Sequence, residues 1–279
     1  MRKFAWVAAG LAVLATGSVI SGARVADAQS APAAKSQLDK ILEKKELRVG
    51  MTLQFKPEMY KDAAGKPAGY DVEVLNLLAK DLGVKLTISD LDFDGLVPGL
   101  LADKFDMVSV GLVARPPRLL QMYFTDSYVP YKQVVAVPAK STRASNVAAF
   151  NKAGTNITAL AGSSAVSSIK SSFPLATVKE FPQQDAAFLE VASGRADAIV
   201  VEEYLAATFI KANPGKLKIV PLSPALNIEF GSWALPKGQG TDFLIYLNGW
   251  LQYYKNNGTL DGLYNSIVAP GVGQVFPRA

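Results

Sequence analysis

Arg118 lies at a position in the predicted fold where its side chain can bind an anion. It follows shortly after an apolar stretch that ends at Val110 and predicts a buried strand. The carboxyl ends of such strands open into the ligand clefts of α/β proteins. A guanidinium at this place can hold a carboxylate through two parallel hydrogen bonds. The alternative is a surface arginine beside the turn that Pro116 and Pro117 form, and the residue alone leaves both roles open.

Two other segments occupy the same kind of junction. Residues 162–164, Gly-Ser-Ser, connect a predicted strand to a predicted helix, where free backbone N–H groups and the helix dipole attract anions. The hydroxyls of Ser163 and Ser164 add donors, although a plain helix cap is the commoner use of serine. Glu202 ends another predicted strand and begins a helix. That position also suits a carboxylate that is stabilised only by the helix dipole, as we expect for Glu203.

The absence of two residue types removes many kinds of enzyme chemistry. The chain contains no cysteine and no histidine, so disulfides, thiol nucleophiles, zinc sites built on either residue and the Ser-His-Asp triad are excluded. Carboxylates, lysine, arginine, tyrosine and hydroxyls remain. We expect no catalytic residue, no metal and no cofactor. The 279 residues, of which 49% are hydrophobic, are enough for one or two domains with a large core.

The first 28 residues have the three parts of a secretory signal peptide. Arg2 and Lys3 precede an uncharged apolar run over residues 4–20, and an Ala-x-Ala motif ends at Ala28. An apolar run of about 20 residues can also anchor a chain in a membrane, but the small residues and the cleavage motif favour removal. We therefore expect cleavage after Ala28 and a location in the periplasm of a bacterium.

The charge pattern does not favour a nucleic-acid partner. The formal net charge is +5, and losing Arg2, Lys3, Arg24 and Asp27 with the leader would leave +3. The remaining positive residues are scattered along the chain and form no basic stripe interleaved with aromatic side chains. We expect no nucleic-acid binding.

The rest of the chain alternates apolar strands with amphipathic helices, which favours an α/β fold with mainly parallel sheets. The predicted strands cover residues 47–51, 84–88, 106–110, 128–138, 156–160, 177–180, 197–201 and 217–221. The predicted helices cover residues 29–45, with a cap at Ser36, and residues 70–82, 94–102, 163–171, 183–192, 202–211 and 241–267. Gly83 should end the helix before it, and Gly258 should interrupt the last one. Between the first strand and the helix at 70–82, Pro57, Gly65 and Pro67 indicate a polar loop.

Two nine-residue segments repeat one pattern and indicate two similar lobes. Residues 102–110 and 193–201 each run from a helix end through a basic turn to an aspartate and then a buried strand. The aspartates, Asp106 and Asp197, precede the strands and suit roles in turns. The β-rich segment 128–138 can cross from one lobe to the other, and the segment 226–233 can return. Two lobes joined by two crossings enclose a cleft, where ligands usually bind.

Residues 46–268 resemble the family-3 extracellular solute-binding proteins, the polar amino-acid receptors of ABC importers. Each matching stretch is short, and their shared order and spacing carry the resemblance. The stretches are LRVG (47–50), GYDV (69–72), FDGLVPGL (93–100), FDMV (105–108), Arg118, FTD (124–126), GSS (162–164), SGRADA (193–198) and NGTL (257–260). The resemblance implies a two-lobed periplasmic-binding-protein fold of type II, an α/β fold with two crossings around a central cleft. Lobe 1 would be residues 46–130 plus 229–279, and lobe 2 residues 131–228.

The resemblance also implies roles for individual residues. Arg118 matches the arginine that binds the ligand's carboxylate, and Glu202 matches the acidic residue that binds its α-ammonium group. Phe55 and Phe93 match aromatic or apolar wall positions, although lone aromatic residues more often belong to a core. The implied ligand-binding residues are Phe55, Phe93, Gly111, Val113, Arg118, Ser163, Ser164 and Glu202.

Departures from the family pattern bear on the ligand class. Val113 stands where the family usually has a threonine or serine that helps to hold the amino-acid head group. Thr52 replaces a frequent acidic or polar residue, and Glu58 and Met59 replace a usual phenylalanine. Losing the hydroxyl at Val113 removes one hydrogen bond, a net loss of about 1 kcal/mol. An amino acid remains the expected ligand, and another small carboxylate is the alternative.

Three classes of function compete. We expect a monomeric receptor that captures a small amino acid-like ligand for an ABC transporter and docks on its permease subunits. The alternative is a periplasmic cyclohexadienyl or arogenate dehydratase on the same scaffold. Such an enzyme needs a general acid near the leaving hydroxyl, a role open to Glu202 or Glu58, but nothing singles out a second catalytic group. A sensing domain is disfavoured, because no later apolar run and no output domain follow. We do not expect an enzyme.

Overall fold

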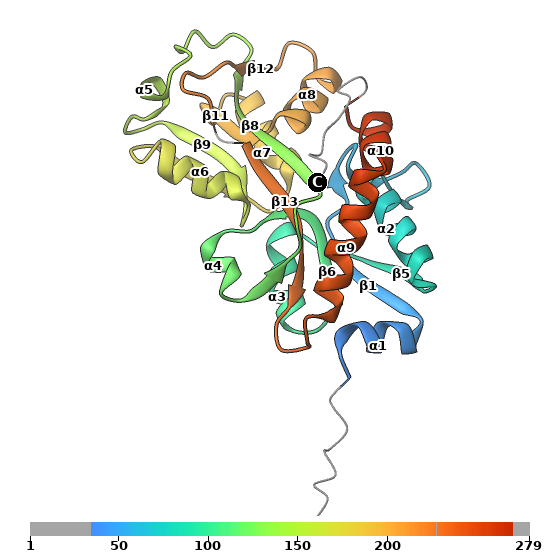
Figure 1. Ribbon diagram of the computed structural model, residues 1–279. Helices are drawn as coiled ribbons and strands as arrows, with labels where there is room; N and C mark the ends of the chain where they lie inside the picture. The colour runs from blue at the N-terminus through green and yellow to red at the C-terminus, as the bar shows by residue number, and fades with distance from the viewer. Residues whose placement is uncertain (1–34, 227, 270–279) are drawn as a thin grey trace, which may run out of the picture. The chain divides into compact units, whose positions relative to one another are not determined.

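Ten strands form one continuous sheet in the computed structural model, which describes residues 35–226 and 228–269 (Figure 1). The strands are β1 (Glu46–Met51), β5 (Lys85–Asp90), β6 (Met107–Val113), β7 (Met122–Phe124), β8 (Val129–Pro138), β9 (Asn156–Leu160), β10 (Thr177–Phe181), β11 (Ala198–Glu202), β12 (Leu217–Val220) and β13 (Ile228–Pro236). Their order is β10-β9-β11-β8-β13-β6-β1-β5, with β12 paired to β8 and β7 paired to β13. The predicted leader 1–28, its cleavage site after Ala28 and residues 29–34 of the predicted first helix lie outside the described residues.

Helices connect the strands and confirm the α/β class. They are α1 (Gln37–Lys44), α2 (Tyr70–Leu82), α3 (Phe93–Leu101), α4 (Pro116–Leu119), α5 (Val147–Phe150), α6 (Ser164–Ser172), α7 (Gln184–Ala192), α8 (Glu203–Ala212), α9 (Asp242–Asn256) and α10 (Thr259–Ile267). Ser36 caps α1 through a reciprocal pair of bonds with Asp39. Gly83 ends α2 in the left-handed conformation, with φ 66°. Gly258, also left-handed, separates α9 from α10 as predicted. In the part of the chain that the structure describes, no helix has both the length and the apolar character of a membrane span.

The two aspartates of the repeated pattern occupy equivalent places. Asp106 Oδ2 accepts a hydrogen bond of 2.8 Å from the backbone N–H of Arg48, and Asp106 Oδ1 lies 2.7 Å from Arg48 Nη2. Asp197 Oδ2 accepts one of 2.8 Å from the backbone N–H of Asn156, and Asp197 Oδ1 lies 2.6 Å from Arg143 Nη2. Arg48 lies in β1 and Asn156 begins β9. Each aspartate therefore ties the start of a buried strand to the parallel strand beside it, in agreement with the predicted turn roles.

Strands β8 and β13 join two groups of strands. The first residues of β8 pair antiparallel with the start of β13, where Val129 lies opposite Gly231. Further along, β8 pairs with β11 and β12, whereas β13 continues along β6 and β7. One group therefore contains β1, β5, β6 and β7 and the other β9, β10, β11 and β12. The two predicted crossings correspond to these two strands, and the exact lobe boundaries at 130/131 and 228/229 stay a prediction.

Each group of strands is covered by its own helices. In β11, the side chains of Ile199 and Val201 belong to the same buried cluster as Phe188 of α7. The side chain of Val200, which points to the other face, belongs to a second cluster with Ile169 of α6. In the other group, α10 packs against α2 and α9 (Figure 1). The segments at and after the carboxyl ends of β6, β9 and β11 carry residues that line one pocket.

The predicted polar loop after β1 is wrong in part. It contains a second, three-stranded antiparallel sheet of β2 (Gln54–Phe55), β3 (Met59–Lys61) and β4 (Pro67–Ala68). Strands of two or three residues, such as β7, give too few alternating positions for a periodic signal. The four-residue helices α4 and α5 are likewise too short to show helical periodicity, so none of the three was predicted. The sheet matters for the site because it fixes Phe55 and the buried Glu58.

A buried polar cluster sits beneath the start of α2. Ser109 Oγ accepts from Trp233 Nε1 at 2.9 Å and donates to Asp71 Oδ1 at 3.2 Å. Tyr128 Oη accepts from the backbone N–H of Gly111 at 2.7 Å. Asp71 is only 1% exposed. Burial raises the pKa of Asp71 to about 7, although hydrogen bonds from Tyr128 and Ser109 oppose the shift.

This raised pKa predicts how the stability of the protein depends on pH. Asp71 binds its proton more tightly when folded than when unfolded, so its contribution is favourable at pH 4 and is lost as the pH rises to 7. We expect Asp71→Asn to reduce the fall in the free energy of unfolding between pH 4 and pH 8 by on the order of a few kcal/mol. Urea denaturation at both pH values measures this difference. Asp242→Asn, at an exposed aspartate, is the matched control, and equal pH slopes for wild type and Asp71→Asn would refute the prediction.

Candidate ligand-binding site

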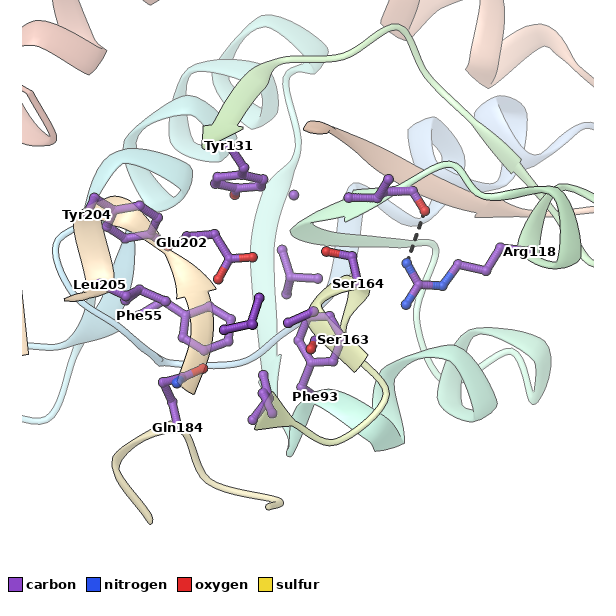
Figure 2. A pocket seen from close by; sticks show the side chains of 16 residues that line it. Phe55, Phe93, Arg118, Tyr131, Ser163, Ser164, Gln184, Glu202, Tyr204 and Leu205 are labelled. Atoms are coloured by element: carbon purple, nitrogen blue, oxygen red, sulfur yellow. Dashed lines mark hydrogen bonds between the residues drawn. The ribbon is translucent and has the colours of Figure 1, made fainter. Parts of the chain in front are cut away.

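All eight residues predicted to bind a ligand line one pocket (Figure 2). They come from β2, α3, β6, α4, the turn before α6, the start of α6 and the end of β11. These segments belong to both groups of strands, so the site lies where the groups meet. The cavity has a volume of ≈ 30 Å³, which is room for only a few water molecules. A larger ligand can therefore enter only if the walls move apart.

Arg118 connects the two sides of the pocket. Its Nη1 donates to the carbonyl oxygen of Val113 at 3.0 Å, and its Nη2 donates to the carbonyl oxygen of Gly162 at 2.8 Å. Within the described residues no carboxylate forms an ion pair with it, since the nearby Glu229 pairs with Arg115. Burial, together with the repulsion of Arg115, lowers the pKa of Arg118 to about 10. Two backbone carbonyls hold this guanidinium, and no carboxylate of the described residues forms an ion pair with it, so an anionic ligand could pair with it.

The two serines lie at the start of α6 as predicted. Ser163 is the N-cap residue, but its side chain makes no capping bond. Its Oγ is buried and finds no hydrogen-bond partner among the described residues, so the plain-cap interpretation fails. Ser164 Oγ accepts a bond of 2.8 Å from Nε2 of Gln133, a buried residue of β8. Because Gln133 supplies that donor, the Ser164 proton is free to point toward an acceptor in the pocket.

Glu202 is the acidic residue of the lining. It ends β11 and precedes α8 without making a capping bond. Burial raises the pKa of Glu202 to about 7, and the repulsion of Glu229 adds to this, while its own backbone N–H and the Gln133 amide oppose the shift. Figure 2 shows its carboxylate and the Ser164 hydroxyl directed toward the same space. Glu203 instead points to the exposed Lys132, with an Nζ–Oε1 distance of 2.7 Å, and takes no part in the site.

The remaining predicted residues shape the walls. The rings of Phe55 and Phe93 have centroids 6.1 Å apart and planes inclined at 49°. Gly111 has φ 58°, and a Cβ there would lie 2.0 Å from the hydroxyl of Tyr131, so no other residue fits. The carbonyl oxygen of Val113 accepts a hydrogen bond from Arg118. This contact uses the backbone, so it does not depend on the side-chain hydroxyl that Val113 lacks.

Comparison with known proteins identifies the family. Residues 47–269 match the model of the bacterial extracellular solute-binding proteins, family 3. The chain belongs to this family. It is 28% identical over 276 residues to a probable histidine-binding protein of Neisseria gonorrhoeae, with 98% of each chain covered. It is 25% identical over 235 residues to the cyclohexadienyl dehydratase of Pseudomonas aeruginosa, and this match covers 83% of this chain and 85% of the enzyme.

A solved structure supports the predicted fold class. The crystal structure of an ancestral amino acid-binding protein, a precursor of cyclohexadienyl dehydratase, superposes with a TM-score of 0.76. It is 32% identical, and the match covers 84% of this chain and 99% of that chain. The two-lobed type II fold is therefore confirmed for this family-3 protein.

Sequence reasoning missed several residues of the pocket in this family-3 protein. Tyr131, Gln184, Tyr204 and Leu205 line it as well (Figure 2). A signal for Gln184 was present, because it begins a helix directly after a strand, which is the junction that pointed to Ser163 and Glu202. No comparable signal marks Tyr131, which lies near the start of a crossing strand.

Glu58, one of the departures from the family pattern, lies behind the pocket and does not line it. It is 0% exposed, and its Oε2 accepts from the hydroxyls of Tyr131 at 2.9 Å and Tyr204 at 2.7 Å. Burial raises the pKa of Glu58 well above its usual range, and the charge of Asp71 adds to the shift. Tyr204 belongs to α8 and Glu58 to the loop after β2. The carboxyl group therefore links the small three-stranded sheet to α8 at the back of the site. Within residues 35–226 and 228–269, acidic side chains form no cluster suited to a metal ion.

Proposed function

We propose that this protein captures an amino acid in the periplasm and delivers it to an ABC importer. The observation that carries the proposal is that Arg118 and Glu202 line the same pocket, and that Arg118 has no ion-pair partner among the described residues. A zwitterionic head group carries the two complementary charges. The relative from Neisseria, whose name is probable histidine-binding protein, supports the same ligand class.

The proposal includes the parts of the protein that serve export and delivery. Residues 1–28 act as a signal peptide that is removed after Ala28. The mature chain works as a monomer, with lobe 1 at residues 46–130 plus 229–279 and lobe 2 at 131–228. Its partners are the permease subunits of the importer, and it needs no metal, cofactor or nucleic acid.

In this proposal, different polar groups of the pocket bind the carboxylate and the α-ammonium group of the ligand. The carboxylate of the ligand takes the donors of Arg118 that Val113 and Gly162 leave free, together with the Ser164 hydroxyl. The α-ammonium group faces Glu202. Phe55 and Phe93 exclude water from both ion pairs, which strengthens them because the local dielectric constant falls.

A panel of ligands tests the proposal. Purified mature protein is titrated by calorimetry with the twenty L-amino acids and with small carboxylates that lack the amino group. At least one amino acid should bind with one-to-one stoichiometry. At 100 times its dissociation constant it should raise the free energy of unfolding by about 2.7 kcal/mol. Binding of plain carboxylates but of no amino acid would refute the ligand class.

A dehydratase is the second candidate, because one observation favours it. Glu202 lines the pocket with a pKa raised to about 7, which suits a general acid at neutral pH, and one relative is named cyclohexadienyl dehydratase. Incubation with arogenate and with prephenate, followed by detection of the aromatic product, tests this activity. Product that forms with wild type and not with Glu202→Gln would establish the enzyme. Absence of product alongside tight amino-acid binding would leave the receptor.

We also expect the two lobes to close on the ligand by a hinge near Tyr131 and Leu226. The reason is that residues from both groups of strands line the pocket, while its cavity of ≈ 30 Å³ has room for only a few water molecules. Solution scattering should give a smaller radius of gyration when ligand is present. The Arg118→Ala variant, at the same ligand concentration, should show no change. Identical curves for free and saturated wild type would contradict a hinged clamp.

A further inference from the structure

The amide nitrogen of a glutamine at the end of the pocket away from Arg118 has no hydrogen-bond partner among the described residues. Gln184 is 3% exposed and lines the cavity, yet no acceptor among the described residues lies within hydrogen-bond distance of its Nε2. Its backbone N–H donates to Gln54 Oε1 at 2.9 Å, which fixes the start of α7 against the opposite group of strands. Figure 2 shows the Gln184 side chain beside Phe55 and Leu205. A buried amide without a partner costs free energy, so a ligand group that pairs with it gains affinity.

The charges of the lining restrict what that ligand group can be. Among the described residues, the lining contains one cationic side chain, Arg118, and one acidic side chain, Glu202. If these bind the α-carboxylate and the α-ammonium group, no charge remains for a third ionic group. Glu58 does not line the cavity. Its Oε2 accepts from the hydroxyls of Tyr131 and Tyr204, and its buried Oε1 has no partner among the described residues. A charged ligand side chain would therefore be buried without a counter-charge, which is unfavourable.

The space beyond Gln184 is balanced in charge as well. A second hollow of ≈ 340 Å³ shares Gln184 and Leu205 with the pocket. It adds one cation, Lys56, and one anion, Asp185. The two charges cancel, so this hollow offers no net opposite charge to a cationic or an anionic side chain of a ligand.

We infer that the ligand is an amino acid with an uncharged side chain that ends in a carboxamide, and that Gln184 is the residue that selects it. The inference rests on the proposed function, because it assigns Arg118 and Glu202 to the head group. The oxygen of a carboxamide can accept a hydrogen bond from Gln184 Nε2, the atom that lacks a partner among the described residues. Phe55 and Leu205 cover the methylene groups that lead to it. Sites that hydrogen-bond a polar substrate group reject analogues without it, because the site is then left unpaired.

Calorimetry on wild type and Gln184→Met tests the assignment. The ligands are glutamine, asparagine, arginine, glutamate and methionine, which is the apolar counterpart of glutamine in length. Wild type should bind glutamine or asparagine at least about tenfold more tightly than the other three ligands. Gln184→Met should lower the affinity for that carboxamide ligand by about tenfold or more. Its affinity for methionine should change by less than about threefold.

Two further variants separate selection from general damage. Gln184→Glu places a second carboxylate in the lining and should raise the affinity for arginine relative to glutamine, an effect that misfolding cannot produce. Gln183→Leu is the matched control, because the neighbouring glutamine bonds to Asp92 and does not line the pocket. It should leave the ratio of affinities unchanged.

The outcomes separate this inference from the proposed function. A wild-type preference for arginine or glutamate would overturn the inference and leave the receptor standing. Equal losses for every ligand in Gln184→Met would do the same. If wild type binds no amino acid at all, the proposed function fails first and the inference fails with it.

Discussion

Arg118→Ala should abolish measurable ligand binding. Truncating one partner of a buried ion pair costs on the order of 2–5 kcal/mol, which corresponds to roughly 30-fold to several-thousand-fold in affinity. The structure gives a reason for the upper part of this range, since Arg118 lacks any ion-pair partner of its own among the described residues and is already held between the carbonyls of Val113 and Gly162. Arg118→Lys should fail largely as well, because an ammonium group cannot reproduce the two parallel bonds of the guanidinium.

Isothermal calorimetry with the tightest amino acid measures this loss. Arg195→Ala is the matched control, because Arg195 pairs with Glu190 away from the pocket, and it should bind like wild type. Urea denaturation of Arg118→Ala shows whether the fold survives the loss of two bonds to backbone carbonyls. A folded Arg118→Ala protein with unchanged affinity would remove Arg118 from the site.

Glu202→Gln should distinguish an amino-acid ligand from a plain carboxylate. The substitution keeps the shape of the side chain and removes the charge that balances a buried ammonium group. Affinity for an amino acid should fall by on the order of 2 kcal/mol or more, while affinity for the matching deaminated acid should change little or increase. The two ligands and two proteins form a double-mutant cycle. Zero coupling between Glu202 and the amino group would refute the amino-acid assignment. Glu203→Gln, at the neighbouring carboxylate that pairs with Lys132, is the control.

The pKa of Glu202 adds a pH dependence to this prediction. An ammonium group binds the ionised carboxylate, and burial raises the pKa of Glu202 to about 7 in the free protein. Below pH 7, binding must therefore displace a proton, and the affinity of wild type should rise by up to about tenfold per pH unit until pH 7 and then level off. Glu202→Gln should show a flat profile over the same range. Affinity of wild type that falls as the pH rises would indicate a plain carboxylate that prefers the protonated Glu202.

The parts of the site that sequence could predict are those set by local rules. The ends of buried strands and the starts of helices pointed to Arg118, Ser163, Ser164 and Glu202, and all four line one pocket. The repeated pattern of an aspartate before a strand indicated two similar halves. In the structure, each aspartate accepts a hydrogen bond from a backbone N–H of the neighbouring strand.

The parts that sequence could not predict depend on distant pairs. The partners of Glu58 are Tyr131 and Tyr204, far along the chain, and no local pattern brings them together. The hydrogen bonds of Arg118 to two backbone carbonyls could not be predicted from the sequence either, because every residue has a carbonyl group. The role of Val113 through its backbone follows the same logic. Its missing hydroxyl is visible in the sequence, and its carbonyl contact is visible only in the structure.

The most direct test is a crystal structure of the mature protein with the amino acid that binds most tightly in calorimetry. The α-carboxylate should lie within hydrogen-bond distance of the Arg118 guanidinium and the Ser164 hydroxyl, and the α-ammonium group should contact Glu202. The Phe55 and Phe93 rings should enclose the ligand between the two lobes. A ligand bound elsewhere, or one whose carboxylate does not contact Arg118, would contradict the proposed mode of capture.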